Sequence, residues 1–376
     1  MQRRHFLSKS AAAGFGIVGA YSLLNSFSPD KLLKFKLKEY QPVNPETAAP
    51  NGAIYIPAKA YNTWQQWKDY DREETERDFG YATSIGLNSL RIWLSYEYWL
   101  ENPQRHEQCL EHMLNVADKK GLKILMALFD SCGVENTKKA REDRNPKTAV
   151  AVTSPGNEIS RNESRWNEPT KFVNRIMERF GNNKNLLAME IMNEPGFRNN
   201  RIAMSRFLFK VAKEKKGSVP LTIGSLPGMQ NWGNFMDLNI DVLQFHINFP
   251  TKLGEFENEL KMARQVAQVL GRPLWLTEWQ RLRVSGDGWN EKKIPQEELG
   301  PDLASLAKTV RNAGIGNYFW SLMLKPAYLK PQRVIGTFNG LFHEDGSVYS
   351  LADARAVSQN PNLQIRERRE PPQWLK

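Results

Sequence analysis

Short apolar runs alternate with longer amphipathic segments from residue 52 to residue 358. The apolar runs have the length of β-strands and are bounded by Gly, Asn or Pro, whereas the longer segments have helical periodicity. This alternation is typical of βα units that build a parallel sheet. We expect strands at residues 53–57, 89–95, 123–130, 186–193, 221–225, 242–248, 274–278 and 317–323. We expect helices near residues 70–86, 104–120, 169–181, 199–215, 254–270, 297–313 and 350–358, and a short helical turn around 230–237.

Eight strands with eight crossovers favour a closed barrel over an open sheet. No glycine-rich phosphate loop follows the first strand, as it would in a doubly wound dinucleotide-binding sheet. A chain of 376 residues could hold two domains, but α/β barrels commonly reach this length as one. The predicted fold class is therefore α/β, a (β/α)8 TIM barrel in a single domain.

Two of the predicted strands end in a glutamate. Residues 191–195 read Ile-Met-Asn-Glu-Pro, and residues 275–279 read Trp-Leu-Thr-Glu-Trp. The carboxyl ends of barrel strands share one face, where active sites lie. Two carboxylates on two strand ends meet the requirement of glycosidic bond cleavage, with Glu194 and Glu278 as acid/base and nucleophile. Structural salt bridges at the barrel rim are the alternative interpretation.

The long connections of the chain belong to the same face. Residues 131–168 follow the third strand, 279–296 the seventh, and 324–349 the eighth. Connections of this length in a compact domain are usually functional. We expect them to form the walls of a substrate cleft.

The first residues have the pattern of an export signal. Arg3, Arg4 and Lys9 precede an apolar run, residues 11–24, that is too short to span a bilayer. The pattern is similar to a bacterial twin-arginine signal, with a Sec signal or an uncleaved anchor as alternatives. We therefore predict export to the periplasm or the extracellular space, without stable membrane insertion once the signal is removed. The predicted parts are a signal (1–29), a linker (30–50) and the barrel domain (51–376).

Charge and composition argue against several other classes of protein. The formal net charge is +11, but the basic residues are scattered and form no stripe interleaved with aromatic residues, so nucleic-acid binding is not indicated. The chain has five histidines and no His-Glu-x-x-His or paired-cysteine spacing. We therefore expect no cluster of three metal ligands, no metal site and no cofactor.

Only two cysteines occur, Cys109 and Cys132. Both belong to one predicted βαβ unit, so a disulfide after export is geometrically reachable. Two separate thiols are the favoured alternative, because neither residue need face the other.

The chain resembles a known group, the clan A glycoside hydrolases. These are retaining (β/α)8 enzymes that include the family 5 cellulases and mannanases. The resemblance covers the strand order over residues 50–355. It is carried by residues on five strands, namely Arg91 in Leu-Arg-Ile-Trp, Asn193 and Glu194 in Asn-Glu-Pro, His246, Glu278, and Trp320 in Tyr-Phe-Trp-Ser.

The resemblance implies a role for five of these polar and charged residues. Glu194 would be the general acid/base, Glu278 the nucleophile, and Asn193 a hydrogen-bond partner of the sugar 2-hydroxyl. Arg91 would lie near Glu278 and hold it ionised, which agrees with the need of a nucleophilic carboxylate for a nearby cation. An ion pair at the rim is the alternative for Arg91. His246 would line the cleft, and a hydrogen-bonded histidine of the core is the alternative there.

Three further residues complete the expected site. Trp320 would form the floor of the subsite that holds the cleaved sugar, because an apolar sugar face stacks well on an indole. Asn248 stands where family members often carry a tyrosine that supports the nucleophile, so either Asn248 takes over this hydrogen bond or another tyrosine does. Asp130 ends the third strand and could bind a sugar hydroxyl or cap the following loop.

The resemblance implies a retaining β-glycosidase that hydrolyses a polysaccharide or its oligosaccharides by double displacement. We then expect the carboxyl groups of Glu194 and Glu278 to lie roughly 4–6.5 Å apart. A catalytically inactive carbohydrate-binding barrel and a transglycosylase that uses the same two glutamates are the alternatives. The expected partner is a carbohydrate substrate. The sequence distinguishes neither the sugar and linkage nor endo from exo action, and it does not indicate an oligomeric state.

Overall fold

The computed structural model describes residues 49–224, 229–284, 300–333 and 336–370. The predicted signal (1–29) and nearly all of the predicted linker (30–50) lie outside these residues, so the proposed domain division remains a prediction. Among the helices that the structure describes, none is both long and apolar enough to cross a membrane.

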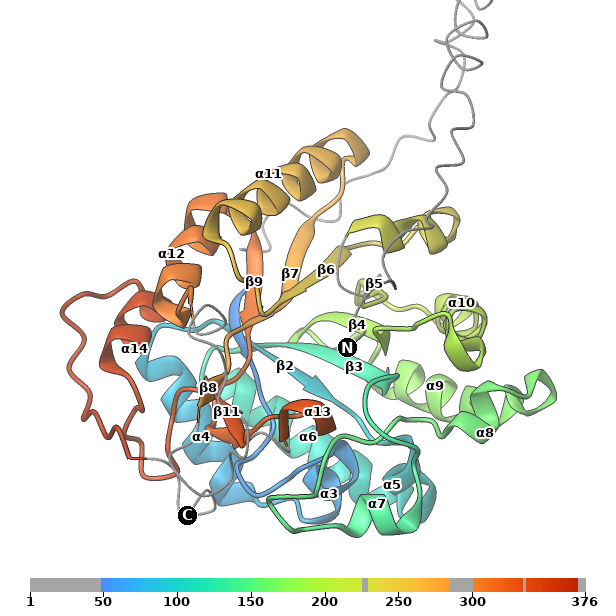
Figure 1. Ribbon diagram of the computed structural model, residues 1–376. Coiled ribbons are helices and arrows are strands. Elements are labelled where there is room, and N and C mark those ends of the chain that lie inside the picture. The colour runs from blue at the N-terminus through green and yellow to red at the C-terminus, as the bar shows by residue number, and fades with distance from the viewer. Residues whose placement is uncertain (1–48, 225–228, 285–299, 334–335, 371–376) are drawn as a thin grey trace, which may run out of the picture. The chain divides into compact units, whose positions relative to one another are not determined.

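Eight parallel strands form one sheet in the order β5-β4-β3-β2-β1-β9-β7-β6 (Figure 1). The two ends of this sheet approach each other, because the Asp241 N–H donates to the Leu221 carbonyl at 2.9 Å and the Thr222 hydroxyl donates to the Val242 carbonyl at 2.7 Å. The sheet is thus a nearly closed barrel, and the predicted (β/α)8 fold is confirmed. The strands are β1 (Asn51–Ile54), β2 (Ser89–Trp93), β3 (Lys123–Asp130), β4 (Leu186–Asn193), β5 (Leu221–Thr222), β6 (Leu243–Asn248), β7 (Leu274–Gln280) and β9 (Gly316–Phe319).

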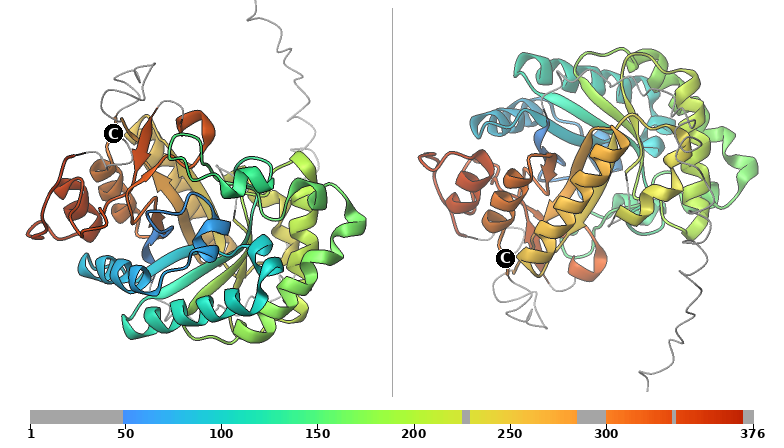
Figure 2. Two further views of the ribbon diagram at one scale, coloured as in Figure 1. Left: turned by 90° about the horizontal axis from the view of Figure 1, so that it is seen from below. Right: turned by 90° about the horizontal axis from the view of Figure 1, so that it is seen from above.

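Helices surround the strands on the outside of the barrel (Figure 2). Several begin at a side-chain cap, as where Asp71 accepts from the N–H groups of Glu73 and Glu74, which satisfies two free donors of the first turn. The crossover elements are α4 (Arg72–Ser84), α6 (Pro103–Lys119), α9 (Asn167–Phe180), α10 (Arg201–Glu214), α11 (Leu253–Leu270), α12 (Leu303–Ala313) and α14 (Leu351–Ser358), with the 3-10 turns η3 (Met229–Asn234) and η4 (Met236–Leu238) after β5.

The connections that follow the strands carry further short elements that the sequence did not predict. A small antiparallel sheet in the order β10-β11-β8 joins the connections after β7 and β9. The additional elements are α3 (Thr63–Lys68), α5 (Tyr96–Glu101), α7 (Lys138–Glu142), α8 (Asn157–Ser160), η1 (Glu163–Arg165), η2 (Arg198–Asn200), β8 (Arg283–Val284), β10 (Lys325–Pro326), α13 (Lys330–Arg333) and β11 (Thr337–Asn339).

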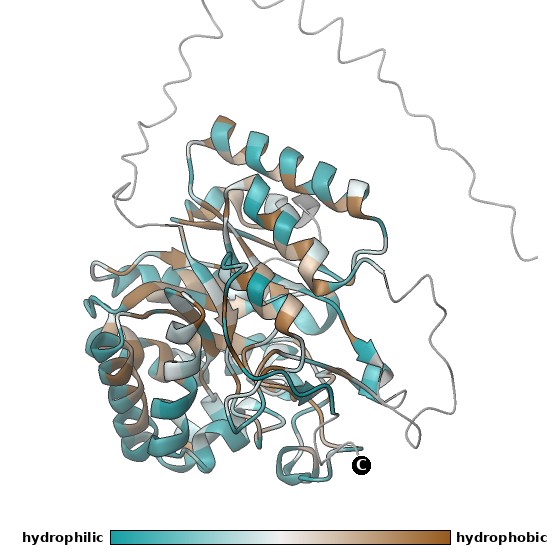
Figure 3. Cartoon of the chain, turned by 90° about the vertical axis from the view of Figure 1, so that its left-hand side faces the viewer, coloured by the Kyte–Doolittle hydropathy of each residue, from teal (hydrophilic) through white to brown (hydrophobic). Residues whose placement is uncertain are grey.

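Strand side chains divide between two hydrophobic layers. On β2, Leu90 and Ile92 pack in the layer between sheet and helices, whereas Trp93 belongs to the cluster inside the barrel. Each fully buried Leu or Ile side chain contributes about 1.5–3 kcal/mol. The strands are accordingly mostly apolar, and the helices carry a hydrophobic and a hydrophilic face (Figure 3). This packing places every strand's carboxyl end at one face, where the candidate site lies.

Candidate active site

Three strand ends bring ionisable side chains together. Asn193 ends β4 and Glu194 follows it directly, while His246 of β6 is paired in register with Glu278 of β7. One oxygen of each glutamate and one ring nitrogen of His246 all lie within 4.8 Å of one another. The cluster follows from parallel strands ending at the same edge.

Arg91 connects most of these groups from inside the barrel. Its side chain is completely buried, and Nη1 donates to Oε1 of Glu278 while Nη2 donates to Oδ1 of Asn193, both at 2.7 Å. Burial lowers the pKa of Arg91, but the charges of Glu190 and Glu278 raise it above its ordinary value. Arg91 therefore lies next to Glu278, as expected, and deep in the barrel rather than at its rim.

Glu190 is a member of the cluster that the sequence analysis missed. Its two oxygens accept from Nε and Nη2 of Arg91 at 2.9 and 2.7 Å, which fixes the plane of the guanidinium. A Cβ on Gly224 would lie 2.3 Å from Oε1 of Glu190, so this approach requires glycine. A glutamate in the middle of an apolar strand was the available signal, because a buried charge needs a partner.

The sequence left open whether Asn248 or a tyrosine elsewhere in the chain makes the supporting hydrogen bond to Glu278. Its Nδ2 donates to Oε2 of Glu278 at 3.1 Å. Its Oδ1 accepts from Gln280 at 2.9 Å, and Gln280 in turn accepts from Asn339 at 2.7 Å. This chain of amides orients Asn248 with its N–H groups toward the carboxylate. No tyrosine hydroxyl within the described ranges donates to Glu278, so Asn248 takes over the hydrogen bond.

Glu194 is held by two partners. Nδ1 of His246 lies 2.6 Å from Oε1, and the Cys132 thiol donates to Oε2 at 3.0 Å. The backbone of Glu194 has a φ of 45°, a left-handed conformation that is uncommon for residues other than glycine and costs about 1 kcal/mol or more. Such strain is concentrated at functional sites.

Glu194 and His246 form a coupled acid–base pair. Burial raises the pKa of Glu194, but the hydrogen bond and charge of His246, with Cys132 and Arg91, lower it below its ordinary value. Burial lowers the pKa of His246, but Glu278 and Glu194 raise it above its ordinary value. These opposite shifts favour an ionised Glu194 beside a protonated His246. Sequence reasoning placed His246 near the cleft but did not predict this contact.

Asp130 lies behind the cluster with both oxygens engaged by protein donors. Oδ1 accepts from the Cys132 N–H and from Nδ2 of Asn193, both at 2.9 Å, and Oδ2 accepts from the Tyr328 hydroxyl at 2.7 Å. Burial raises the pKa of Asp130 to about 6. Asp130 thus caps the loop after β3 and orients Asn193; its contact with a sugar hydroxyl remains a prediction. Tyr328, in the long last connection, had no sequence signal.

The described residues enclose a cavity of about 50 Å³ over the two glutamates. Trp320 lies in its wall, with its ring centroid 4.9 Å from that of Tyr328 and 5.7 Å from that of Trp93. Asp130 is not among the residues that line this cavity. The lining residues are Cys132, Asn193, Glu194, Asn248, Phe249, Glu278, Gln280, Trp320, Tyr328, Leu329 and Gln332.

The expectation that no three metal ligands would cluster is wrong. Glu194, His246 and Glu278 offer one ligand atom each at a spacing that could hold a metal ion. Sequence spacing could not show this group, because its members come from three different strands. The same atoms already have partners within the protein, since His246 is bonded to Glu194 and Arg91 to Glu278. The carboxylates of this group are therefore already paired with nitrogen atoms of the protein.

The two cysteines are both free thiols. Cys109 is buried in α6, and Cys132 lies after β3 beside Glu194. Burial, together with the charges of Glu194 and Asp130, raises the pKa of Cys132 well above its ordinary value. Cys132 is therefore a protonated hydrogen-bond donor.

Comparison with known proteins finds similarity in structure only. No protein-family model matches the sequence, and no curated protein matches it. An endo-β-1,4-mannanase of Thermotoga petrophila aligns over 87% of this chain and 80% of its own, with 12% identity and a TM-score of 0.57. An exo-β-1,4-mannosidase of Opitutaceae bacterium strain TAV5 aligns over 83% of this chain and 59% of its own, with 16% identity and a TM-score of 0.58.

An endoglucanase of Thermotoga maritima aligns over 81% of this chain and 96% of its own, with 13% identity and a TM-score of 0.56. These structures share the (β/α)8 barrel with the present chain. The resemblance in fold that the sequence indicated is confirmed. At such low identities the similarity concerns the fold, and activity has to be argued from the site.

Proposed function

We propose that the chain is a retaining β-glycosidase that hydrolyses O-glycosidic bonds of a polysaccharide or its oligosaccharides by double displacement. The observation that carries this proposal is the pair Glu194 and Glu278, whose nearest ligand oxygens lie within 4.8 Å at the carboxyl ends of two barrel strands. Carboxyl groups about 5–5.5 Å apart favour retention, because this spacing lets one of them attack the sugar directly. The glycosidase fold of the structural neighbours supports the same conclusion.

In the first step Glu278 attacks the anomeric carbon and the leaving oxygen takes a proton from Glu194. Arg91 and Asn248 each bind one oxygen of Glu278, which orients the carboxylate toward the sugar. The proton comes from the Glu194–His246 pair. As negative charge develops on the leaving oxygen, the proton moves from His246 through Glu194 to that oxygen.

In the second step the glycosyl ester on Glu278 is hydrolysed. Esterification removes the negative charge of Glu278, and Glu194 then accepts a proton from the incoming water. The raised pKa of His246 lets it take up this proton again. The cycle thus ends in the protonation state in which it began, with retention at the anomeric carbon.

Substrate contacts fall to Asn193 and Trp320. Nδ2 of Asn193 donates to Asp130 at 2.9 Å and, over a longer distance of 3.7 Å, to the Cys132 sulfur; the sugar 2-hydroxyl takes the place of the weaker sulfur acceptor. Trp320 provides the stacking surface. The cavity of about 50 Å³ is smaller than the roughly 300 Å³ or more of ordinary ligand sites. Sugar entry therefore requires displacement of the side chains that close the cavity from the last connection, among them Tyr328.

The test is a screen of purified protein on aryl β-glycosides and on mannan, glucan, xylan and galactan, with NMR of the anomeric protons of the first product. We expect a β-anomer from a β-linked substrate. Initial formation of the α-anomer would contradict double displacement, and binding without turnover would indicate a sugar-binding barrel. Products longer than the substrate would identify a transglycosylase.

We also propose that the protein is exported, on the basis of the signal pattern in residues 1–29. Expression in a bacterial host followed by fractionation and N-terminal sequencing tests this. We expect a shortened protein in the periplasm or the medium. Retention in the cytoplasm with an intact N-terminus would contradict export.

A further inference from the structure

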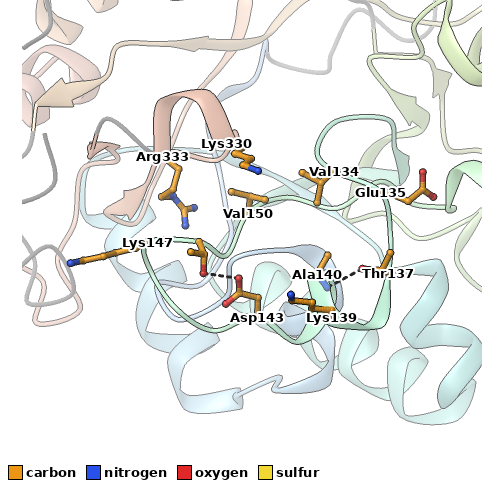
Figure 4. A pocket seen from close by; sticks show the side chains of 11 residues that line it. Val134, Glu135, Thr137, Lys139, Ala140, Asp143, Lys147, Val150, Lys330 and Arg333 are labelled. Carbon is orange, nitrogen blue, oxygen red and sulfur yellow. Dashed lines mark hydrogen bonds between the residues drawn. The ribbon is translucent and has the colours of Figure 1, made fainter. Parts of the chain in front are cut away.

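A second, larger cavity lies on the far side of α13 from the candidate active site. Its volume is about 440 Å³, within the roughly 300–1,000 Å³ of sites that bind small ligands. Figure 4 shows that Lys330 and Arg333 of α13 lie across it from Lys139 and the neighbouring Asp143. The long connection after β3 and the last connection therefore both line it.

The two cavities are neighbours that share these connections. Leu329 and Gln332 line the catalytic cavity, whereas Lys330 and Arg333 line the second one, so α13 presents one face to each. The Tyr328 segment is tied to the other wall, because the Ala151 N–H donates to the Tyr328 carbonyl at 3.2 Å. Residues 328–333 thus contribute side chains to both cavities, so a glycan that occupied both would cross this short segment.

Arg333 is the most informative residue of the second cavity. Its side chain is only 2% exposed, and Nε donates to the Ala327 carbonyl at 2.7 Å while Nη1 donates to that of Pro146 at 2.9 Å. Nη2 makes no hydrogen bond with any residue that the structure describes. Arg333 also forms no ion pair with any acidic residue that the structure describes. The guanidinium lies 5.5 Å from the centroid of the Tyr61 ring, and Asp143 acts on it only through space, so it is a buried charge with no anion in direct contact.

The surrounding charges strengthen this conclusion. Lys139 and Lys330 are exposed and form no ion pair within the described ranges. Of the two carboxylates in the lining, Glu135 faces Asn157 and lies 3.9 Å from Arg161, and Asp143 accepts from the Thr148 hydroxyl and the Asn145 N–H. Four basic and two acidic residues line the cavity, so it has an excess of positive charge.

We propose that this cavity binds an anionic group of the glycan, so that the substrate is an acidic polysaccharide. The group is a carboxylate, as in a uronic acid, or a sulfate ester. Both present oxygens that match the planar N–H donors of Arg333, with Lys139 and Lys330 as further cations. This inference rests on the proposed function, because it treats the second cavity as an extension of the same substrate site.

The experiment is affinity electrophoresis in gels that contain glycans with a common backbone. Hydroxyethylcellulose is the neutral probe, carboxymethylcellulose carries carboxylates, and cellulose sulfate carries sulfate esters. We expect at least one anionic glycan to retard the protein more than the neutral one, and the favoured probe identifies the anionic group. The double variant Lys139→Glu/Lys330→Glu should reduce this ratio by about fivefold, the effect of losing two partly exposed ion pairs.

The matched control is Lys261→Glu/Lys308→Glu, which makes the same change in net charge on the exposed outer helices α11 and α12. It should retain the wild-type ratio. Equal retardation by neutral and anionic glycans, or an equal loss in both double variants, would overturn the proposal. Thermal unfolding midpoints verify that both variants are folded. Retardation needs no turnover, so failure here and failure of the proposed hydrolysis are separate results.

Discussion

Nδ2 of Asn248 lies 3.1 Å from Oε2 of Glu278, while Nη1 of Arg91 lies 2.7 Å from the other oxygen of the same carboxylate. The proposed nucleophile thus has a neutral donor on one side and a cation on the other. The amide of Asn248 makes the hydrogen bond to this carboxylate that the sequence comparison led us to expect from either Asn248 or a tyrosine hydroxyl. Its orientation depends on Gln280 and Asn339, which lie in other parts of the chain.

Replacement of Asn248 tests this support of the nucleophile. Asn248→Ala should reduce kcat/KM by about tenfold, since one hydrogen bond to a charged group contributes about 1.5–3 kcal/mol. Asn248→Asp should be more harmful, because it places a negative charge beside Glu278. Steady-state kinetics on an aryl glycoside measures both. Wild-type rates for both variants would show that Glu278 does not depend on this contact.

Replacement of Glu278 tests its role as the nucleophile. Glu278→Ala should abolish turnover, and added azide should restore a product of inverted anomeric configuration, because azide takes the place of the missing nucleophile. Glu257→Ala, at an exposed position of α11, serves as the control and should behave as wild type. Near-normal rates of Glu278→Ala on a natural glycan would make Glu278 a structural residue.

Glu194→Ala should affect substrates unequally. Aryl glycosides with acidic phenols leave without protonation, so their hydrolysis should suffer least, whereas a natural glycan with a poor leaving group should suffer most. A plot of log kcat/KM against leaving-group pKa should therefore be steeper for the variant than for wild type. Equal slopes for the variant and the wild type would show that Glu194 is not the general acid.

The Glu194–His246 pair predicts a shift of the pH profile. The proton can reside on either group, so the pair loses it at a pH at least as high as Glu194 alone would. The raised pKa of His246 moves the basic limb of kcat/KM to higher pH than an unperturbed histidine would give. His246→Asn removes this second proton site, and the basic limb should move to lower pH. An unchanged limb would show that the pair does not supply the catalytic proton.

Arg91 should contribute to stability as well as to catalysis. Arg91→Ala leaves the buried Glu190 and Glu278 without their cation, and breaking a buried ion pair costs about 3–5 kcal/mol. The free energy of unfolding from urea titrations at neutral pH measures this loss. Arg165→Ala, which removes an exposed pair with Glu168 within one connection, should remain close to wild type. Equal stability of both variants would contradict the buried network.

The thiols give a simple chemical test. Alkylation in denaturant without reductant, followed by mass spectrometry, should label both Cys109 and Cys132, because both are free in the structure. Native Cys132 should react slowly, since its thiol remains protonated beside Glu194. Two unlabelled cysteines under denaturing conditions would instead indicate a disulfide.

The barrel and the face that carries its site could be predicted from patterns in the sequence. Hydrophobic periodicity defined strands such as Lys123–Asp130 and Leu186–Asn193, which the structure reproduces with the same bounds. Strand order and strand polarity then place Glu194 and Glu278 together, because parallel strands in a barrel end at one face. These features depend on local patterns and on topology, which a linear sequence carries.

The tertiary structure alone decided which side chains meet around the two glutamates. Glu190 lies 99 residues from Arg91, and Tyr328 lies 198 residues from Asp130. No motif of characteristic spacing in the sequence could have revealed either contact. The contact between His246 and Glu194 sets the protonation preference of that pair, and the amide of Gln280 decides which way Asn248 points. Such contacts depend on sub-ångström packing of segments that are distant in the chain, and no local pattern encodes that.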